Sequence, residues 1–186
     1  MLDLLGASAL AGFCSKVADE VIDRHLRFSA PLVVILAISY GLLLGWVSGQ
    51  AGLSSLFLAL ALASLLSGKI DHPYHMLGAA AFAVVVFFSP LAGFMPWWFA
   101  LFLLSGLLDE LELGRGRVFA FMNEERLWTP LAVVLGVLAL GMPVLFLMAL
   151  LLFDLSFRFG GWIVGLEYPA QAVKKVNTPA KGKRKK

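Results

Sequence analysis

The chain has 186 residues, of which 60% are hydrophobic and 15% are charged, with a formal net charge of +3. A typical soluble domain is about half apolar and about a quarter charged, so this composition excludes an ordinary soluble domain. The single cysteine, Cys14, excludes an internal disulfide and any Cys-x-x-Cys site. We expect an all-α, polytopic bundle of transmembrane helices in the cell membrane.

The positive charge is concentrated at the end of the chain. Seven lysines and arginines, and no acid, follow Glu167. The preceding residues carry 8 basic and 12 acidic side chains, a net charge of −4. We therefore expect a transmembrane domain over 1–168 and a disordered, basic, cytosolic tail over 169–186. Such a tail suits the anionic headgroups of membrane lipids better than nucleic acid.

Residues 2–25 predict the first helix. Several small residues would let a second helix pack closely against it: Gly6, Ala7, Ser8, Ala9, Ala11 and Gly12. Asp3 stands where a secretory signal would be basic, so we expect no cleavable signal peptide. The helix either crosses the membrane, which gives seven spans, or lies at the interface, which gives six. We expect it to cross.

Three windows lack Asp, Glu, Lys and Arg: 28–68, 72–108 and 127–153. Gly or Pro interrupts each window near its middle, and these residues are the strongest helix punctuators, so each window predicts a helical hairpin. The expected helices lie near 30–48, 52–68, 74–90, 95–112, 123–141 and 144–166. Hairpins return the chain to one side, so the charged segments and the tail share one face. The positive-inside rule places that face in the cytosol.

The first candidate site lies on the N-terminal helix. Lys16, Asp19, Glu20 and Asp23 share one helical face by their spacing. Asp19 and Asp23 would supply carboxylates to Mg²⁺, which binds one or two protein carboxylates together with a substrate phosphate. Lys16 would bind the substrate. The alternative is a set of ordinary ion pairs, Lys16 with Glu20 and Glu20 with Arg24.

The second candidate site is the loop 68–75. Asp71, His72 and His75 could bind a metal or transfer protons, because histidine changes its charge near neutral pH. Lys69 could contact a phosphate. A proline opens the next helix, which places His75 near the N-terminus of that helix. The alternative is a polar loop in which Asp71 caps the helix.

The third candidate site lies at the C-terminal end of the fourth predicted span. Asp109 and Glu110 would oppose the helix dipole there, so we expect a compensating cation or a basic partner. Two arginines that follow within a few residues are the nearest candidates. Asp109 would be a further ligand of Mg²⁺. Glu124 and Glu125 would start the next helix, where the dipole favours acids, and are expected to be structural.

The fourth candidate site is Asp154 and Arg158, one turn apart inside the last apolar helix. An intramembrane acid is by default a functional candidate. The alternative is a pair in which each charge neutralises the other. The sequence contains no Gly-x-Ser-x-Gly, P-loop or His-Glu-x-x-His motif.

The leading hypothesis is an integral membrane enzyme, a transferase or hydrolase, that acts on a phosphate-bearing amphipathic lipid or isoprenoid. Acids would hold Mg²⁺: Asp19, Asp23, Asp71 and Asp109. Other groups would bind substrate or move protons: Lys16, Lys69, His72, His75, Asp154 and Arg158. No organic cofactor is indicated. The alternatives are a small ion- or proton-coupled transporter or channel, expected to form a homo-oligomer, and a structural or assembly subunit.

Overall fold

The computed structural model describes residues 1–23, 28–50, 52–91, 93–110 and 117–167. Within these ranges the chain is all-α, without a strand, which confirms the predicted class. The helices are α1 (Leu2–Asp23), α2 (Ala30–Ser48), α3 (Ser54–Leu66), α4 (Pro73–Phe88), α5 (Pro96–Glu110), α6 (Arg117–Glu124), α7 (Trp128–Leu140) and α8 (Val144–Glu167). The predicted basic tail lies outside the described residues.

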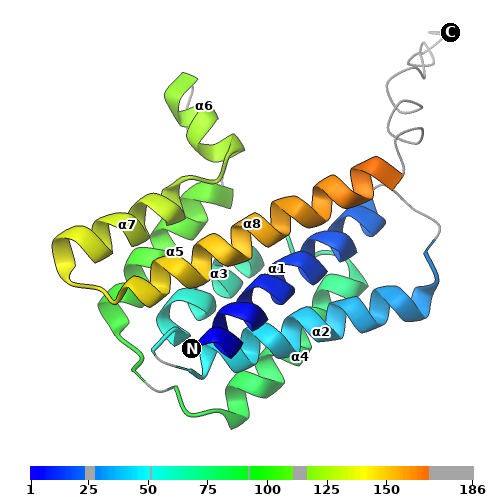
Figure 1. The fold of residues 1–186 in the computed structure, drawn as a ribbon, viewed down its shortest axis with the longest axis horizontal. Coiled ribbons are helices and arrows are strands. Elements are labelled where there is room, and N and C mark those ends of the chain that lie inside the picture. Colours follow the sequence, from blue (N-terminus) through cyan, green and yellow to red (C-terminus); the bar gives the residue numbers. More distant parts are fainter. Residues whose placement is uncertain (24–27, 51, 92, 111–116, 168–186) are drawn as a thin grey trace, which may run out of the picture.

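All three predicted hairpin breaks separate two helices. Residues 49–53 follow α2, residues 89–95 follow α4 and residues 141–143 follow α7. Each break contains a glycine in the left-handed region, which side chains with a Cβ rarely adopt: Gly52 (φ 79°), Gly93 (φ 70°) and Gly141 (φ 68°). In Figure 1 these turns and the N-terminus lie at the lower left, whereas α6 and the end of α8 lie at the upper side.

Helices that are consecutive in the chain are not always the closest packing partners. α1 packs along α8 and α2, α4 packs on α2, and α5 packs on α3 (Figure 1). α7 contacts both α5 and α8. Six helices therefore form a ring in which each contacts the next, in the order α1, α2, α3, α5, α7, α8 and back to α1. The expected second hairpin is therefore open: α4 and α5 share a turn, but each packs mainly on another helix.

The small residues of α1 allow the close packing that the sequence predicts. The Ser8 hydroxyl donates a hydrogen bond to the Ala149 carbonyl oxygen of α8 at 2.8 Å. A Cβ atom at Gly12 would collide with the carbonyl oxygen of Phe153. Gly6, in contrast, has no atom within 4 Å of such a Cβ position, so only part of the small-residue run forms the interface.

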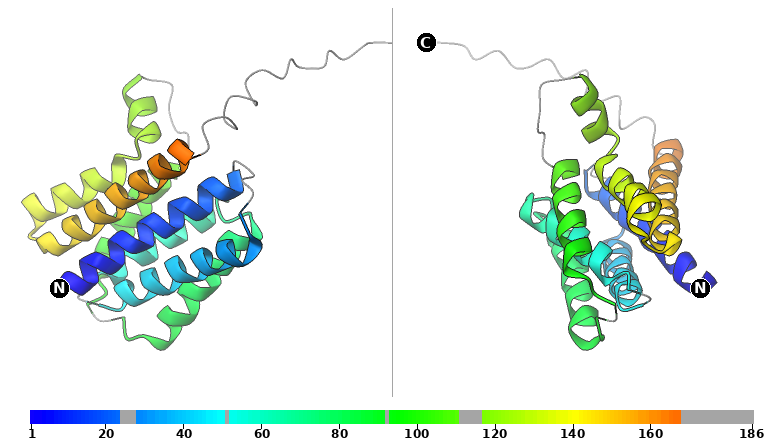
Figure 2. Two further views of the ribbon diagram at one scale, coloured as in Figure 1. Left: turned by 45° about the vertical axis from the view of Figure 1, so that its right-hand side comes forward. Right: turned by 90° about the vertical axis from the view of Figure 1, so that its left-hand side faces the viewer.

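The helix predicted over 123–141 is wrong at its start. The chain forms the short helix α6 first, breaks at Arg126 (φ 52°), and begins α7 at Trp128. α6 stands away from the other helices in both views of Figure 2. Glu124 therefore ends α6 and Glu125 follows it, so neither starts the long helix, and the dipole argument for these two acids does not apply.

Two helices are long and apolar enough to cross a membrane: α2 over its whole length and α8 over Val144–Gly165. α3, α4 and α7 are apolar but shorter, with 13, 16 and 13 residues. At about 1.5 Å per residue, 13 residues extend about 20 Å, less than the roughly 30 Å of a bilayer core. By length and composition, α2 and α8 indicate association with a membrane.

Candidate functional site

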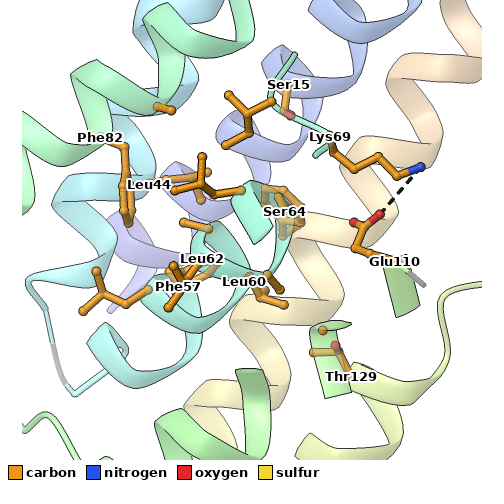
Figure 3. A pocket seen from close by; sticks show the side chains of 18 of the residues that line it. Ser15, Leu44, Phe57, Leu60, Leu62, Ser64, Lys69, Phe82, Glu110 and Thr129 are labelled. Atoms are coloured by element: carbon orange, nitrogen blue, oxygen red, sulfur yellow. Dashed lines mark ion pairs between the residues drawn. The ribbon is translucent and has the colours of Figure 1, made fainter. Parts of the chain in front are cut away.

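A cavity of about 710 Å³ runs beside α3 and is lined by residues of α1, α2, α3, α4, α5, α7 and α8. Both α3 and α4 line it; they are joined by a short loop but are not close packing partners. Apolar side chains form most of the wall, among them Phe57 and Leu60 from α3, Phe82 from α4 and Leu44 from α2 (Figure 3). An elongated apolar wall of this kind suits a hydrocarbon chain.

Polar side chains enter the cavity from the helix ends that lie opposite the three turns. Six residues that the sequence singles out line it: Asp19, Lys69, His75, Asp109, Glu110 and Asp154. They come from α1, the α3–α4 loop, α4, α5 and α8, so the fold brings separate candidate sites together. The other predicted site residues do not line the cavity: Lys16, Asp23, Asp71, His72 and Arg158.

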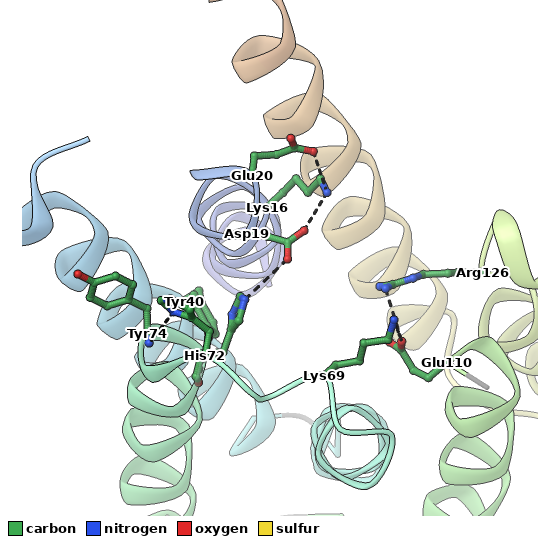
Figure 4. A network of polar contacts seen from close by, with 10 residues as sticks. Lys16, Asp19, Glu20, Tyr40, Lys69, His72, Tyr74, Glu110 and Arg126 are labelled. Atoms are coloured by element: carbon green, nitrogen blue, oxygen red, sulfur yellow. Dashed lines mark hydrogen bonds and ion pairs between the residues drawn. The ribbon is translucent and has the colours of Figure 1, made fainter. Parts of the chain in front are cut away.

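Asp19 lies between a lysine and a histidine. Lys16 Nζ is 2.9 Å from Asp19 Oδ2 and 3.0 Å from Glu20 Oε1. His75 Nε2 is 3.8 Å from the other Asp19 oxygen, Oδ1 (Figure 4). The expected Lys16–Glu20 pair is thus present, but the same lysine also holds Asp19. The second Asp19 oxygen is left facing the imidazole ring.

The Glu110 carboxylate forms ion pairs with two basic side chains. Arg126 Nη2 is 3.5 Å and Lys69 Nζ is 3.9 Å from the same oxygen, Glu110 Oε2 (Figure 4). The Glu110 side chain is only 10% exposed, while the two cations are more than half exposed. The compensating basic partners that the sequence analysis expected are therefore present in the structure, but they come from distant positions in the chain.

Asp109 caps a helix that is not its own. Its Oδ1 accepts a hydrogen bond from the Trp128 backbone N–H, and its Oδ2 accepts one from Thr129, both at 2.8 Å. These two N–H groups open α7 and have no partner inside that helix. A carboxylate at a helix N-terminus is also favoured by the helix dipole. Asp109 thus fixes the start of α7 against the end of α5.

Arg158, the alternative partner of Asp154, makes its short contacts with another acid, although its charge still acts on the Asp154 carboxylate from further away. Arg158 Nη1 donates to Glu125 Oε2 at 2.9 Å, and Nη2 donates to the Glu125 carbonyl oxygen at 3.2 Å. Glu125 attracts the guanidinium group because the α6–α7 break brings this acid next to α8. Among the described residues, none makes a hydrogen bond or ion pair with the Asp154 carboxylate, which lines the cavity.

The helix cap of α4 is His72 and not Asp71. His72 Nδ1 accepts a hydrogen bond from the Tyr74 backbone N–H at 3.4 Å, and Pro73 opens the helix as predicted. Asp71 is exposed and lies outside the cavity. The His72 and His75 rings lie 6.3 Å apart, centroid to centroid. The proton-transfer candidate that faces the cavity is therefore His75.

The four acids predicted as Mg²⁺ ligands do not form one cluster. In the part of the chain that the structure describes, no three His, Cys, Asp or Glu side chains are grouped so that they could hold a metal ion. Asp19 and Asp109 line the cavity, but Asp109 is already bound to two backbone N–H groups. The involvement of Mg²⁺ stays a prediction.

Arg126 and Thr129 are among the polar cavity residues that were not singled out from the sequence. Arg126 reaches Glu110 only because the chain breaks between α6 and α7. Thr129 is 3% exposed, and its hydroxyl has no hydrogen-bond partner. Neither residue carries a local sequence signal of such a position. The chain matches no protein-family model, no curated protein and no solved structure. Its function is therefore argued from the site.

Proposed function

We propose that the chain is a multi-pass membrane protein in which α1 to α5, α7 and α8 cross the bilayer. The uncharged turns 49–53, 89–95 and 141–143 would lie on the outer side, and the charged helix ends in the cytosol. The short helices are extended by apolar turn residues, and a bilayer adapts to modest mismatch at small cost.

Cysteine labelling tests this topology. In a Cys14→Ser background, Ser89→Cys should react with a membrane-impermeant maleimide added to whole cells. Asp71→Cys, in the loop between α3 and α4, should react only after the cells are opened. Equal labelling of both positions in intact cells would contradict the topology.

The function we propose is enzymatic action on the headgroup of an amphipathic lipid that lies between α3 and α4. The observation that carries this proposal is one cavity in which apolar walls continue into a group of ionisable side chains. The hydrocarbon chain would lie against Phe57 and Phe82, and the headgroup would reach Asp19 and His75. The gap between α3 and α4 would admit the lipid sideways from the bilayer.

The Asp19–His75 pair supports a catalytic role. An imidazole beside a carboxylate can accept a proton from an attacking water or alcohol, and the carboxylate stabilises the imidazolium that forms. Lys16 holds Asp19 in place through the other carboxylate oxygen, Oδ2, at 2.9 Å. His75 would thus act as the general base and Asp19 as its orienting partner, in a hydrolysis or transfer at the headgroup.

Turnover and binding are tested together. Purified protein in lipid nanodiscs is incubated with a total lipid extract of the source cells, and lipid products are followed by mass spectrometry. Ala79→Trp, which fills the cavity from α4, should abolish turnover, while Ala80→Trp, on the same helix but outside the cavity, should not. His75→Ala should abolish turnover and retain bound lipid. Unchanged products in both Ala79→Trp and His75→Ala would reject the enzyme.

A proton- or ion-coupled transporter is the second candidate, and it is favoured by Asp154. An acid without an ion-pair partner among the described residues, inside an apolar helix, is typical of ion pathways. Proteoliposomes with an imposed proton gradient should then show flux that Asp154→Asn eliminates. Proton flux equal to that of empty liposomes would exclude this candidate.

A further inference from the structure

We infer that the headgroup taken up at this cavity carries a protonated amine. The inference rests on the proposed function and names the chemical class of the ligand. It is carried by the contacts of the polar side chains at the cavity. The cations there already face carboxylates, whereas several acceptor atoms receive no hydrogen bond from the described residues.

The basic side chains at the cavity are occupied by acids. Lys69 and Arg126, which line it, both face Glu110. Lys16, beside it, is held by Asp19 and Glu20 at 2.9 and 3.0 Å. A phosphate headgroup would share these cations with the carboxylates that they already face. Lipid phosphate would therefore compete with carboxylates at this end of the cavity.

Acceptor atoms, in contrast, are left without donors. Glu110 Oε2 is buried and has no hydrogen bond, although two cations lie at 3.5 and 3.9 Å. The Thr129 hydroxyl is likewise buried without a hydrogen-bond partner. Asp154 makes no hydrogen bond and no ion pair within 4 Å among the described residues, although the charges of Arg158 and Arg126 act on it from further away. All three residues line the cavity.

An ammonium group matches this arrangement. It offers three N–H donors and no acceptor, and it brings the positive charge that an unpaired carboxylate lacks. The described charged side chains that line the cavity are four acids and two cations: Asp19, Asp109, Glu110, Asp154, Lys69 and Arg126. The polar end is therefore net negative with neutral histidine, which repels an anionic headgroup and attracts a cationic one. Asp154 would form the main ion pair.

Three single-chain amphiphiles of equal length separate the contribution of the headgroup to binding from that of the hydrocarbon chain: hexadecylamine, hexadecanol and hexadecyl phosphate. Binding is measured by competition against radiolabelled hexadecylamine, with the protein in phosphatidylcholine nanodiscs and empty nanodiscs as the background. We expect the amine to bind about tenfold more tightly than the alcohol, which is about 1.4 kcal/mol, and the phosphate to bind most weakly. An excess of sodium should leave amine binding unchanged.

Variants assign the preference to Asp154. Asp154→Asn should remove the advantage of the amine and leave hexadecanol binding unchanged, which also shows that the variant is folded. Asp154→Glu keeps the charge and should keep the preference. Asp3→Asn, at the far end of α1 and outside the cavity, is the matched control. If Asp154→Asn does not fold, the order of the three amphiphiles on the unmodified protein decides.

The outcomes separate the two proposals. Tightest binding of the phosphate, an unchanged amine preference in Asp154→Asn, or displacement of the amine by sodium would overturn the amine headgroup. The cavity would still bind an amphiphile in those cases, so the proposed function would stand. Failure of all three amphiphiles to bind above the background would overturn the proposed function itself.

Discussion

The α1–α8 pair and the α3–α4 pair are opposites in this fold. α1 and α8 are remote in the chain, yet their backbones approach so closely that a Cβ at Gly12 would meet a carbonyl oxygen. α3 and α4 are joined by a short loop, yet they are not close packing partners, and both line a cavity of about 710 Å³. The first pair holds the bundle together, and the second leaves room for a ligand.

Side-chain size explains most of this difference. The α1 face toward α8 is built from small residues such as Ser8, Ala11 and Gly12, which let two helices pack backbone to backbone. The bulkier groups of α3 contact other helices: Leu60 lies against Gly106 of α5, and the Phe57 ring lies 6.3 Å from the Phe153 ring of α8. α4 uses its own small residue, Gly78, against Tyr40 of α2 and so turns away from α3.

The largest effect should come from a single methyl group in the tight pair. Gly12→Ala places a Cβ against the Phe153 backbone, which cannot move aside as a flexible side chain can. We expect a loss of about 3 kcal/mol in the free energy of unfolding, typical of overpacking without room to relax. Reversible unfolding by SDS in mixed micelles measures it.

Gly6→Ala is the matched control on the same helix, because nothing lies within 4 Å of its added Cβ. Alanine favours a helix over glycine by up to about 1 kcal/mol, so this variant should be unchanged or slightly more stable. Equal destabilisation by both variants would show that α1 does not pack on α8 as described.

The close packing of α1 was predictable from the sequence, but its partner α8 and the opening between α3 and α4 were not. The small residues around Gly12 predict a close helix contact, and Gly and Pro predict the three hairpin turns, because both are local properties of the chain. The opening between α3 and α4 depends on which helix each one packs against. The Glu125–Arg158 contact likewise depends on the break at Arg126, which the sequence does not mark.

The next largest effect should come from Asp109, which lines the cavity and caps α7. Asp109→Ala leaves the first two N–H groups of α7 without their acceptors. We expect a loss of about 2 kcal/mol, since caps contribute about 1 kcal/mol and bonds to charged groups more. Asp109→Asn keeps one acceptor oxygen and should lose about half as much. Thermal unfolding in nanodiscs compares the two, and equal losses would show that the carboxylate does not cap α7.

A smaller effect is expected from the hydrogen bond inside the tight pair. Ser8→Ala removes the bond to the Ala149 carbonyl oxygen but keeps the small side chain that the contact requires. Hydrogen bonds between membrane helices contribute about 0.6 kcal/mol on average, so we expect a loss of this size. Ser8→Val, which adds bulk at the fully buried position, should cost clearly more. If the alanine and valine variants were equally stable, size would not control this interface.

The smallest effect should come from added bulk in the open pair. Ala79→Leu points a larger apolar side chain into the cavity, where space exists, so the unfolding free energy should change by no more than about 0.5 kcal/mol. This residue lies one position from Gly78, where a Cβ would collide with the Tyr40 ring. In the same SDS titration, an added Cβ at Gly78 should lower the free energy of unfolding, whereas Ala79→Leu should leave it nearly unchanged. A loss above about 2 kcal/mol for Ala79→Leu would mean that α3 and α4 close on each other in the folded protein, and the proposed lipid site would be lost with the gap.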